Sequence, residues 1–124
     1  MLKMNHEVSV SKNQTRCDDQ SLSFALDKGA HLVMFGAEHC GVCQVIWPQL
    51  LVALDERWSS LKLHYIDCGK HQENCAQHGV YSLPVVRLYF DGRLYLEKMQ
   101  VFSLGPFIAD INALCEQYSV QNDR

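Results

Sequence analysis

Two cysteines separated by two residues are the part of this sequence with the most specific chemistry. Cys40 and Cys43 lie in the segment Glu-His-Cys-Gly-Val-Cys, after a short apolar run and before a long amphipathic pattern. This order predicts that they lie where a buried strand meets the first turn of a helix. The unpaired N–H groups and the dipole of a helix N-terminus favour a thiolate, which is the nucleophilic form of cysteine. Two intervening residues let the second sulfur reach back and resolve a mixed disulfide on the first.

Metal binding is the competing interpretation of the cysteines, because the same spacing supplies two ligands in many zinc sites. No second close pair is present, since six residues lie between Cys68 and Cys75. With His71 and His78, these two cysteines would share one face of a single helix. That helix has few other apolar residues to turn inward, so Cys75 is expected to face the sheet and the histidines to face solvent. Redox chemistry is therefore favoured, and no metal site is expected.

The remaining cysteines are expected to be structural. If Cys68 and Cys75 belong to one helix, their Cα atoms are separated by about 10.5 Å along its axis, whereas a disulfide tolerates at most about 6.8 Å. A bridge between them then requires that Gly69 breaks the helix early and leaves Cys68 in the preceding loop. Cys17 and Cys115 are expected to be small buried hydrophobic residues.

The bulk composition fits one soluble domain. The 124 residues are 48% hydrophobic and 20% charged, close to the averages for globular proteins. A formal net charge of −3 gives no basic footprint for nucleic acid. The first thirty residues contain no apolar leader core, and no apolar run approaches the roughly 20 residues that a membrane span needs. We therefore expect a monomer of the cytoplasm, with neither nucleic acid nor a membrane as partner.

Hydropathy patterns divide the chain into alternating elements that position the cysteine pair. Residues 1–13 are expected to form a flexible tail or an edge strand, and residues 14–120 the domain. Parallel pairing follows from a strand–helix–strand order, and a hairpin adds antiparallel edges. We predict an α/β fold with a mixed sheet of four or five strands and helices on both faces. The expected elements are a strand near 14–17, a helix over 21–28, a strand over 31–36, a helix over 40–58 bent at Pro48, a strand over 61–66, a helix over 68–78, a strand over 85–90, a turn at Asp91-Gly92, a strand over 94–96 and a helix from Gly105.

The motifs around the cysteines resemble those of the thioredoxin family, from about residue 14 to the C-terminal helix. The resemblance implies the thioredoxin fold and a thiol-disulfide oxidoreductase that reduces or exchanges protein disulfides through the Cys40/Cys43 couple, without a cofactor. The matching features are Phe35-Gly36-Ala37-Glu38 for the aromatic-Trp-Ala-Glu segment, Pro48 for the helix-kinking proline, Leu83-Pro84 for the cis-proline, Asp91-Gly92 for the hairpin turn and Gly105 for the glycine of the last helix.

The same resemblance implies how partners approach the site. A disulfide-containing substrate protein is expected to pair its backbone with Leu83, beside Pro84, while its disulfide faces Cys40. Electrons are expected to come from a thioredoxin-reductase-like or glutathione-linked reductant. The other residues expected to contact substrate are His39, Gly41 and Val42.

Three departures from the family pattern bear on activity. His39 stands where thioredoxins carry Trp, Met34 where they carry a buried Asp, and Leu63 where they carry a facing Lys. The buried acid is thought to assist deprotonation of the second cysteine, so the sequence also fits a slower enzyme. The alternative function is an adapter or co-chaperone that binds partners beside Pro84 with little turnover. His39 is interpreted either as an exposed loop residue or as a cation that lowers the pKa of Cys40.

The residue before the second cysteine yields a testable prediction about redox potential. Val42 keeps a backbone N–H where ordinary thioredoxins carry Pro, and this donor can stabilise the Cys40 thiolate. Stabilising the reduced form raises the potential, so we predict a couple less reducing than the about −270 mV of thioredoxin. Equilibration with glutathione measures the potential, and a value at or below that of thioredoxin contradicts the prediction.

Overall fold

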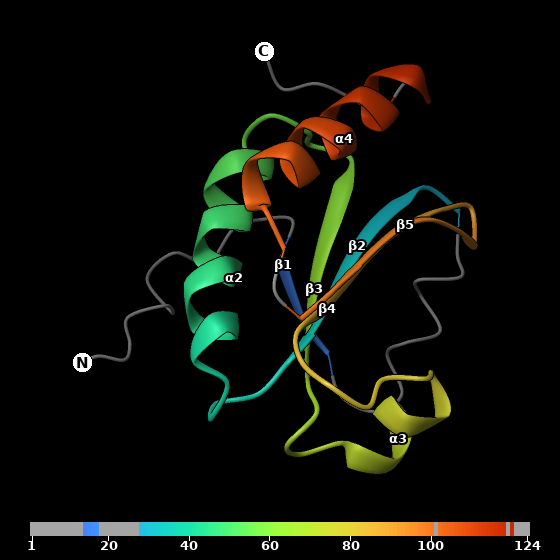
Figure 1. The fold of residues 1–124 in the computed structure, drawn as a ribbon. Coiled ribbons are helices and arrows are strands. Elements are labelled where there is room, and N and C mark those ends of the chain that lie inside the picture. The colour runs from blue at the N-terminus through green and yellow to red at the C-terminus, as the bar shows by residue number, and fades with distance from the viewer. Residues whose placement is uncertain (1–13, 18–27, 101, 119, 121–124) are drawn as a thin grey trace.

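The fold is a mixed five-stranded sheet with helices packed against it (Figure 1). The computed structural model describes residues 14–17, 28–100, 102–118 and 120. The strand order is β1-β3-β2-β4-β5. β3 pairs in parallel with β1 and β2, whereas β4 pairs antiparallel with β2 and β5. The elements are β1 Gln14–Cys17, β2 Ala30–Gly36, α2 Gly41–Leu54, β3 Leu61–Asp67, α3 Gln72–Gln77, β4 Val85–Phe90, β5 Arg93–Met99 and α4 Leu104–Gln117.

This architecture confirms the fold predicted from the sequence, including the strand near residue 14. The predicted tail over 1–13 and nearly all of the predicted helix over 21–28 lie outside the described residues. The boundaries of the domain therefore stay a prediction. No helix in the described part of the chain is long and apolar enough to cross a membrane.

The sheet separates two apolar clusters, and β2 contributes to both of them. All seven residues of β2 are buried, which explains why its sequence is a continuous apolar run rather than an alternating one. Leu32 and Met34 belong to the larger cluster, which also takes in the buried faces of α2 and α4. Val33 and Phe35 belong to the smaller cluster, which includes the α3 residue Cys75. α2 and α4 lie on one side of the sheet, and α3 lies at the end where α2 begins (Figure 1).

The long helix α2 contains Pro48 without ending there, as the periodicity predicts. It ends at Leu54, however, so Trp58 does not belong to it as the sequence suggested. Trp58 is nevertheless almost fully buried, and its indole nitrogen donates a hydrogen bond of 2.7 Å to Asn112 Oδ1 on α4. Trp58 is therefore buried because it packs against α4, and not because α2 continues for a further turn.

The hairpin between β4 and β5 has the turn that its sequence predicts. Asp91 has a φ angle of 52° and Gly92 one of 84°, so both central residues are in the left-handed region that a type I′ turn requires. Asp91 is also tied to the start of β2, because its carboxylate accepts a hydrogen bond of 2.6 Å from Gly29 N.

The segment after β3 departs most clearly from the sequence prediction, because Cys68 and Cys75 form a disulfide. The helix does not begin at Cys68, since α3 starts only at Gln72. Asp67 Oδ1 accepts a hydrogen bond of 2.9 Å from Gly69 N, and this side-chain turn directs the backbone away from a helical path. Cys68 therefore lies in a loop, with its Cα atom 5.9 Å from that of Cys75.

This second disulfide is predicted to stabilise the oxidised protein. It closes a short loop, and cross-links of this kind typically contribute about 2 kcal/mol to the free energy of unfolding. In a Cys40→Ser/Cys43→Ser background, replacing Cys68 and Cys75 by Ser should lower stability by about that amount. Urea unfolding with and without dithiothreitol measures the difference, which should vanish under reduction. Equal stability of the two variants without reductant contradicts the prediction.

Two histidines pair inside the sheet. His31 Nδ1 lies 2.9 Å from His64 Nε2, and both side chains are buried. His31 Nε2 lies 3.2 Å from the carbonyl oxygen of Lys28. Since a carbonyl only accepts, His31 carries its proton on Nε2, and His64 Nε2 donates to His31 Nδ1. Burial first, and then the electrostatic influence of the neighbouring His31 and Lys62, lowers the pKa of His64 to about 3.

The His64 pKa predicts that stability falls as pH falls below about 6.5. Between pH 6.5 and the folded pKa of about 3, His64 binds a proton in the unfolded chain but not in the folded chain. Each pH unit then costs up to about 1.4 kcal/mol. His64→Gln keeps a donor but cannot be charged, so it should flatten this dependence. Urea midpoints between pH 4 and 8 measure it, and the same slope in His64→Gln counts against it.

Candidate active site

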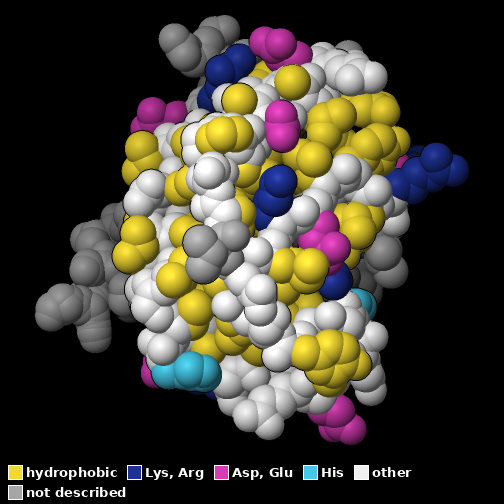
Figure 2. Space-filling model, viewed as in Figure 1, with side chains coloured by type: hydrophobic (Ala, Val, Ile, Leu, Met, Phe, Trp, Pro, Cys, Tyr) yellow, Lys and Arg dark blue, Asp and Glu magenta, His cyan; other side chains and the backbone are white. Residues whose placement is uncertain are grey.

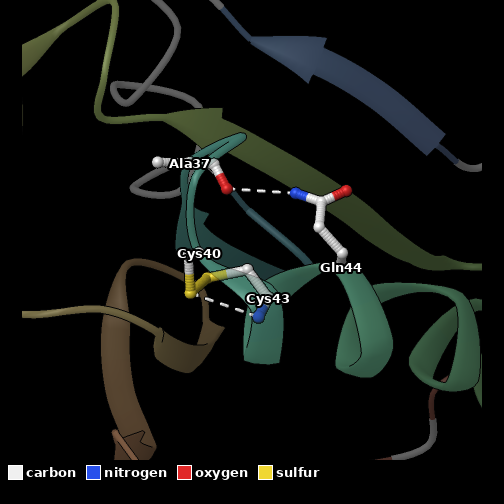
Figure 3. The surroundings of a disulfide bond; sticks show 4 residues. All are labelled: Ala37, Cys40, Cys43 and Gln44. Carbon is white, nitrogen blue, oxygen red and sulfur yellow. Dashed lines mark hydrogen bonds between the residues drawn. A yellow bond between two sulfur atoms is a disulfide. The ribbon is translucent and has the colours of Figure 1, made fainter. Parts of the chain in front are cut away.

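The cysteine pair lies at the N-terminus of α2, as the sequence predicts. Cys40 is the N-cap residue of the helix, and its sulfur accepts a hydrogen bond of 3.2 Å from Cys43 N. Cys40 and Cys43 are joined by a disulfide, with their Cα atoms 5.2 Å apart. Figure 3 shows this disulfide together with the hydrogen bond from Cys43 N to the Cys40 sulfur. The N–H that reaches Cys40 is that of Cys43 rather than the Val42 donor expected from the sequence.

The two sulfur-bearing residues differ in exposure, which separates their chemical roles. Cys40 is half-buried, whereas Cys43 is fully buried against the larger cluster. An incoming disulfide can therefore reach Cys40, while Cys43 is accessible mainly from within the protein. This asymmetry is what a nucleophile and a resolving thiol require.

The loop before the pair is fixed by backbone and side-chain hydrogen bonds. The Ala37 carbonyl accepts one bond of 3.1 Å from Cys40 N. It accepts another of 3.0 Å from Gln44 Nε2 (Figure 3). Gln44 lies one turn into α2, so the loop is anchored to the helix that it precedes. Cys40 is therefore positioned by the helix on one side and by the end of β2 on the other.

The segment before β4 also has the expected geometry, since the Leu83-Pro84 peptide bond is cis. Pro84 is buried, and Leu83 is half-buried against both apolar clusters. Gln100 holds this segment from the end of β5. Its N–H donates a bond of 2.7 Å to the Pro84 carbonyl, and its side-chain amide donates one of 3.0 Å to Ser82 Oγ.

A shallow hollow of about 290 Å³ connects the cysteine loop to the proline segment. His39 and Leu83 both line it, so the structure brings together two of the residues predicted to contact substrate. Gly41 and Val42 are not among its lining residues, although both are exposed at the start of α2. The hollow is also lined by Cys68 and Cys75, which places the second disulfide beside the predicted substrate path.

The strand register adds Tyr65 to the residues expected around Met34. Met34 is fully buried, but its partner on β3 is Tyr65, whereas Leu63 pairs with Leu32. The residue facing the position of the missing acid is therefore Tyr65. Its neighbour Gly36 is also significant, because a Cβ atom added there would come within 2.6 Å of the Tyr65 hydroxyl.

Sequence reasoning missed several residues that shape the site. A strand register slips by two residues without any change in hydropathy pattern, so Tyr65 could not be distinguished from Leu63. Gln100 has a φ angle of 61°, and an isolated residue in that conformation leaves no pattern in its neighbours. Gly69 was the one available signal for the Cys68–Cys75 bridge.

The described residues include no cluster of three or more His, Cys, Asp or Glu side chains placed to hold a metal ion. The predicted face of Cys68, His71, Cys75 and His78 does not form, because Cys68 precedes α3 and is bonded to Cys75. On the face drawn in Figure 2, Lys and Arg side chains are scattered singly among Asp and Glu rather than gathered in a basic patch.

A cysteine pair at a helix N-terminus beside a cis-proline, on a mixed sheet, defines a thiol-disulfide oxidoreductase. A family model described as thioredoxin matches residues 8–104, so the chain belongs to the thioredoxin family. Thioredoxin of Bacillus subtilis is 34% identical over 79 residues, which are 64% of this chain and 76% of that protein. Thioredoxin of Pseudomonas aeruginosa is 28% identical over 85 residues, 68% of this chain and 79% of that one.

Longer proteins carry similar segments. A probable protein disulfide-isomerase A6 of Medicago sativa is 31% identical over 86 residues, which are 68% of this chain but 22% of that protein. These relatives support disulfide chemistry at the Cys40/Cys43 pair and give no support to an adapter without turnover.

Proposed function

We propose that this chain reduces or exchanges disulfides in other proteins through the Cys40/Cys43 couple. One observation carries the proposal: the half-buried Cys40 sulfur accepts an N–H bond at the start of α2, while Cys43 is buried directly behind it. The helix N-terminus stabilises a thiolate on Cys40, and the buried partner is within bonding distance to displace a bound substrate.

The reaction proceeds by two exchanges. The Cys40 thiolate attacks one sulfur of a substrate disulfide, and the other substrate sulfur leaves as a thiolate that takes a proton from water. Cys43 then loses its proton and attacks the Cys40 sulfur, which releases the second substrate thiol. Two electrons have passed to the substrate, and the protein holds the Cys40–Cys43 disulfide.

Substrate recognition is assigned to the surface around the hollow. A substrate backbone pairs with Leu83 beside Pro84, and His39, Gly41 and Val42 contact the residues around its disulfide. Supporting this assignment, Val42, two residues after Cys40, is 42% exposed, and Tyr81, which lines the hollow, is 83% exposed.

The reductant is proposed to be a thioredoxin-reductase-like or glutathione-linked dithiol system, and the location the cytoplasm. The relatives named thioredoxin support the first part of this proposal. The second disulfide offers a test of the location, because the glutathione and thioredoxin systems of the cytoplasm keep protein thiols reduced. Thiol trapping in intact cells should find Cys68 and Cys75 reduced, and finding them bonded would contradict a cytoplasmic location.

Substitution of single cysteines tests the roles of the pair. Cys40→Ser should abolish the acceleration of insulin reduction by dithiothreitol, because it removes the nucleophile. Cys43→Ser should also stop turnover but should accumulate mixed disulfides on Cys40, since no thiol remains to resolve them. Turbidity measures the turnover, and non-reducing gels followed by mass mapping measure the trapping.

Cys115 provides the matched control for both variants. It is a free cysteine, fully buried, and burial raises the pKa of its thiol to about 12. Cys115→Ser should therefore leave turnover unchanged and trap nothing. Equal trapping by Cys40→Ser and Cys43→Ser would overturn the assigned roles.

A further inference from the structure

Tyr65 brings a hydroxyl group to the buried side of the cysteine pair. The side chain comes from β3 and is 8% exposed. A Cβ atom added to Gly36 would lie 2.6 Å from the Tyr65 hydroxyl oxygen and 3.1 Å from Cys43 Cβ. The hydroxyl and Cys43 therefore share the space that the missing side chain of Gly36 leaves open.

The position of the phenol ring is fixed by its neighbours. Tyr65 pairs with Met34 in the sheet register, and its ring meets Trp47 edge-on with centroids 5.3 Å apart. Trp47 lies one turn after Cys43 on α2, and all of these side chains belong to the larger buried cluster. The ring is held between the sheet and the helix, with its hydroxyl end over Gly36.

We propose that the Tyr65 hydroxyl donates a hydrogen bond to the Cys43 sulfur when that sulfur is a thiolate. The inference deepens the proposed function, on which it rests. Cys43 is fully buried, and burial without a donor disfavours a thiolate. A phenol hydroxyl can donate to the sulfur and keep its own proton throughout. Tyr65 thereby serves the resolving step without acting as a base.

The assignment specifies what happens to each proton. In the resolving step, the Cys43 proton leaves to water, and Cys43 attacks the Cys40 sulfur to form the disulfide. The substrate sulfur leaves Cys40 and takes a proton from water. When a reductant thiolate attacks Cys40 in the reverse direction, Cys43 is the leaving thiolate and again accepts the Tyr65 hydrogen bond.

Neighbouring side chains at this end of the sheet are engaged or placed differently from Tyr65. From β2, Met34 offers no proton. From the loop, Glu38 and His39 are exposed. The carboxylate of Asp67, at the end of β3, accepts the Gly69 N–H.

A two-phase reaction with dithionitrobenzoate tests the proposal. In a Cys68→Ser/Cys75→Ser background, which removes the second dithiol, reduced protein releases one thionitrobenzoate when Cys40 attacks and a second when Cys43 resolves the mixed disulfide. In Tyr65→Phe, the pKa that governs the second phase should rise by about one unit or more, which slows it about tenfold at pH 7. The two proteins should converge at high pH, and the first phase should be unchanged. Tyr89→Phe on β4 is the matched control and should behave as wild type.

Several outcomes would overturn the assignment. An unchanged second phase in Tyr65→Phe, or one slowed equally at every pH, shows that the hydroxyl does not stabilise the thiolate. Gly36→Ala gives an independent arm, because its Cβ displaces the hydroxyl and should raise the same pKa. Gly105→Ala is its control, since a Cβ there meets nothing within 4 Å. Failure of the proposed function gives a different result. In that case the protein with Tyr65 intact would itself lack a second phase that depends on Cys43, and Cys43→Ser would change nothing.

Discussion

The hydrogen bond from Cys43 N to Cys40 Sγ is the interaction on which the chemistry of this protein depends. It exists because α2 begins at Gly41 and leaves its first N–H groups without partners in the helix. The loop before α2 and the strand β2 both help to position the Cys40 sulfur at the start of the helix. The Ala37 carbonyl anchors the loop to both Cys40 and Gln44, and β2 supplies a buried strand whose end cannot shift without disturbing both clusters.

Local signals in the sequence were sufficient for most of this arrangement. Asp91-Gly92 predicts its turn because only particular residues tolerate a positive φ at both central positions. The start of α2 at the cysteines follows from the periodicity of its apolar residues, and Pro48 does not interrupt that periodicity. These features depend on residues close in the chain, which is why a single sequence reveals them.

The misplaced features depend on contacts that the pattern does not encode. The loop containing Cys68 is held by a hydrogen bond from Cys68 N to the Gly36 carbonyl and by one from Gly69 N to Asp67 Oδ1, which competes with a helical start. Leu63 and Tyr65 lie on the same face of β3, and only the register with β2 identifies Tyr65 as the direct partner of Met34. Trp58 shows the same limit, since α4 rather than its own helix determines its burial.

Leu83 packs against both apolar clusters, and one cluster contains Cys43 while the other contains Cys68 and Cys75. The residue beside the proposed substrate path is therefore also a structural link between the two halves of the core. A substitution that altered the shape of the substrate surface at this position would change the packing on both sides of the sheet at once. Evolution toward new substrates at Leu83 is consequently constrained by a trade-off between affinity and stability, whereas Tyr81, which is 83% exposed, can vary with little cost to the fold.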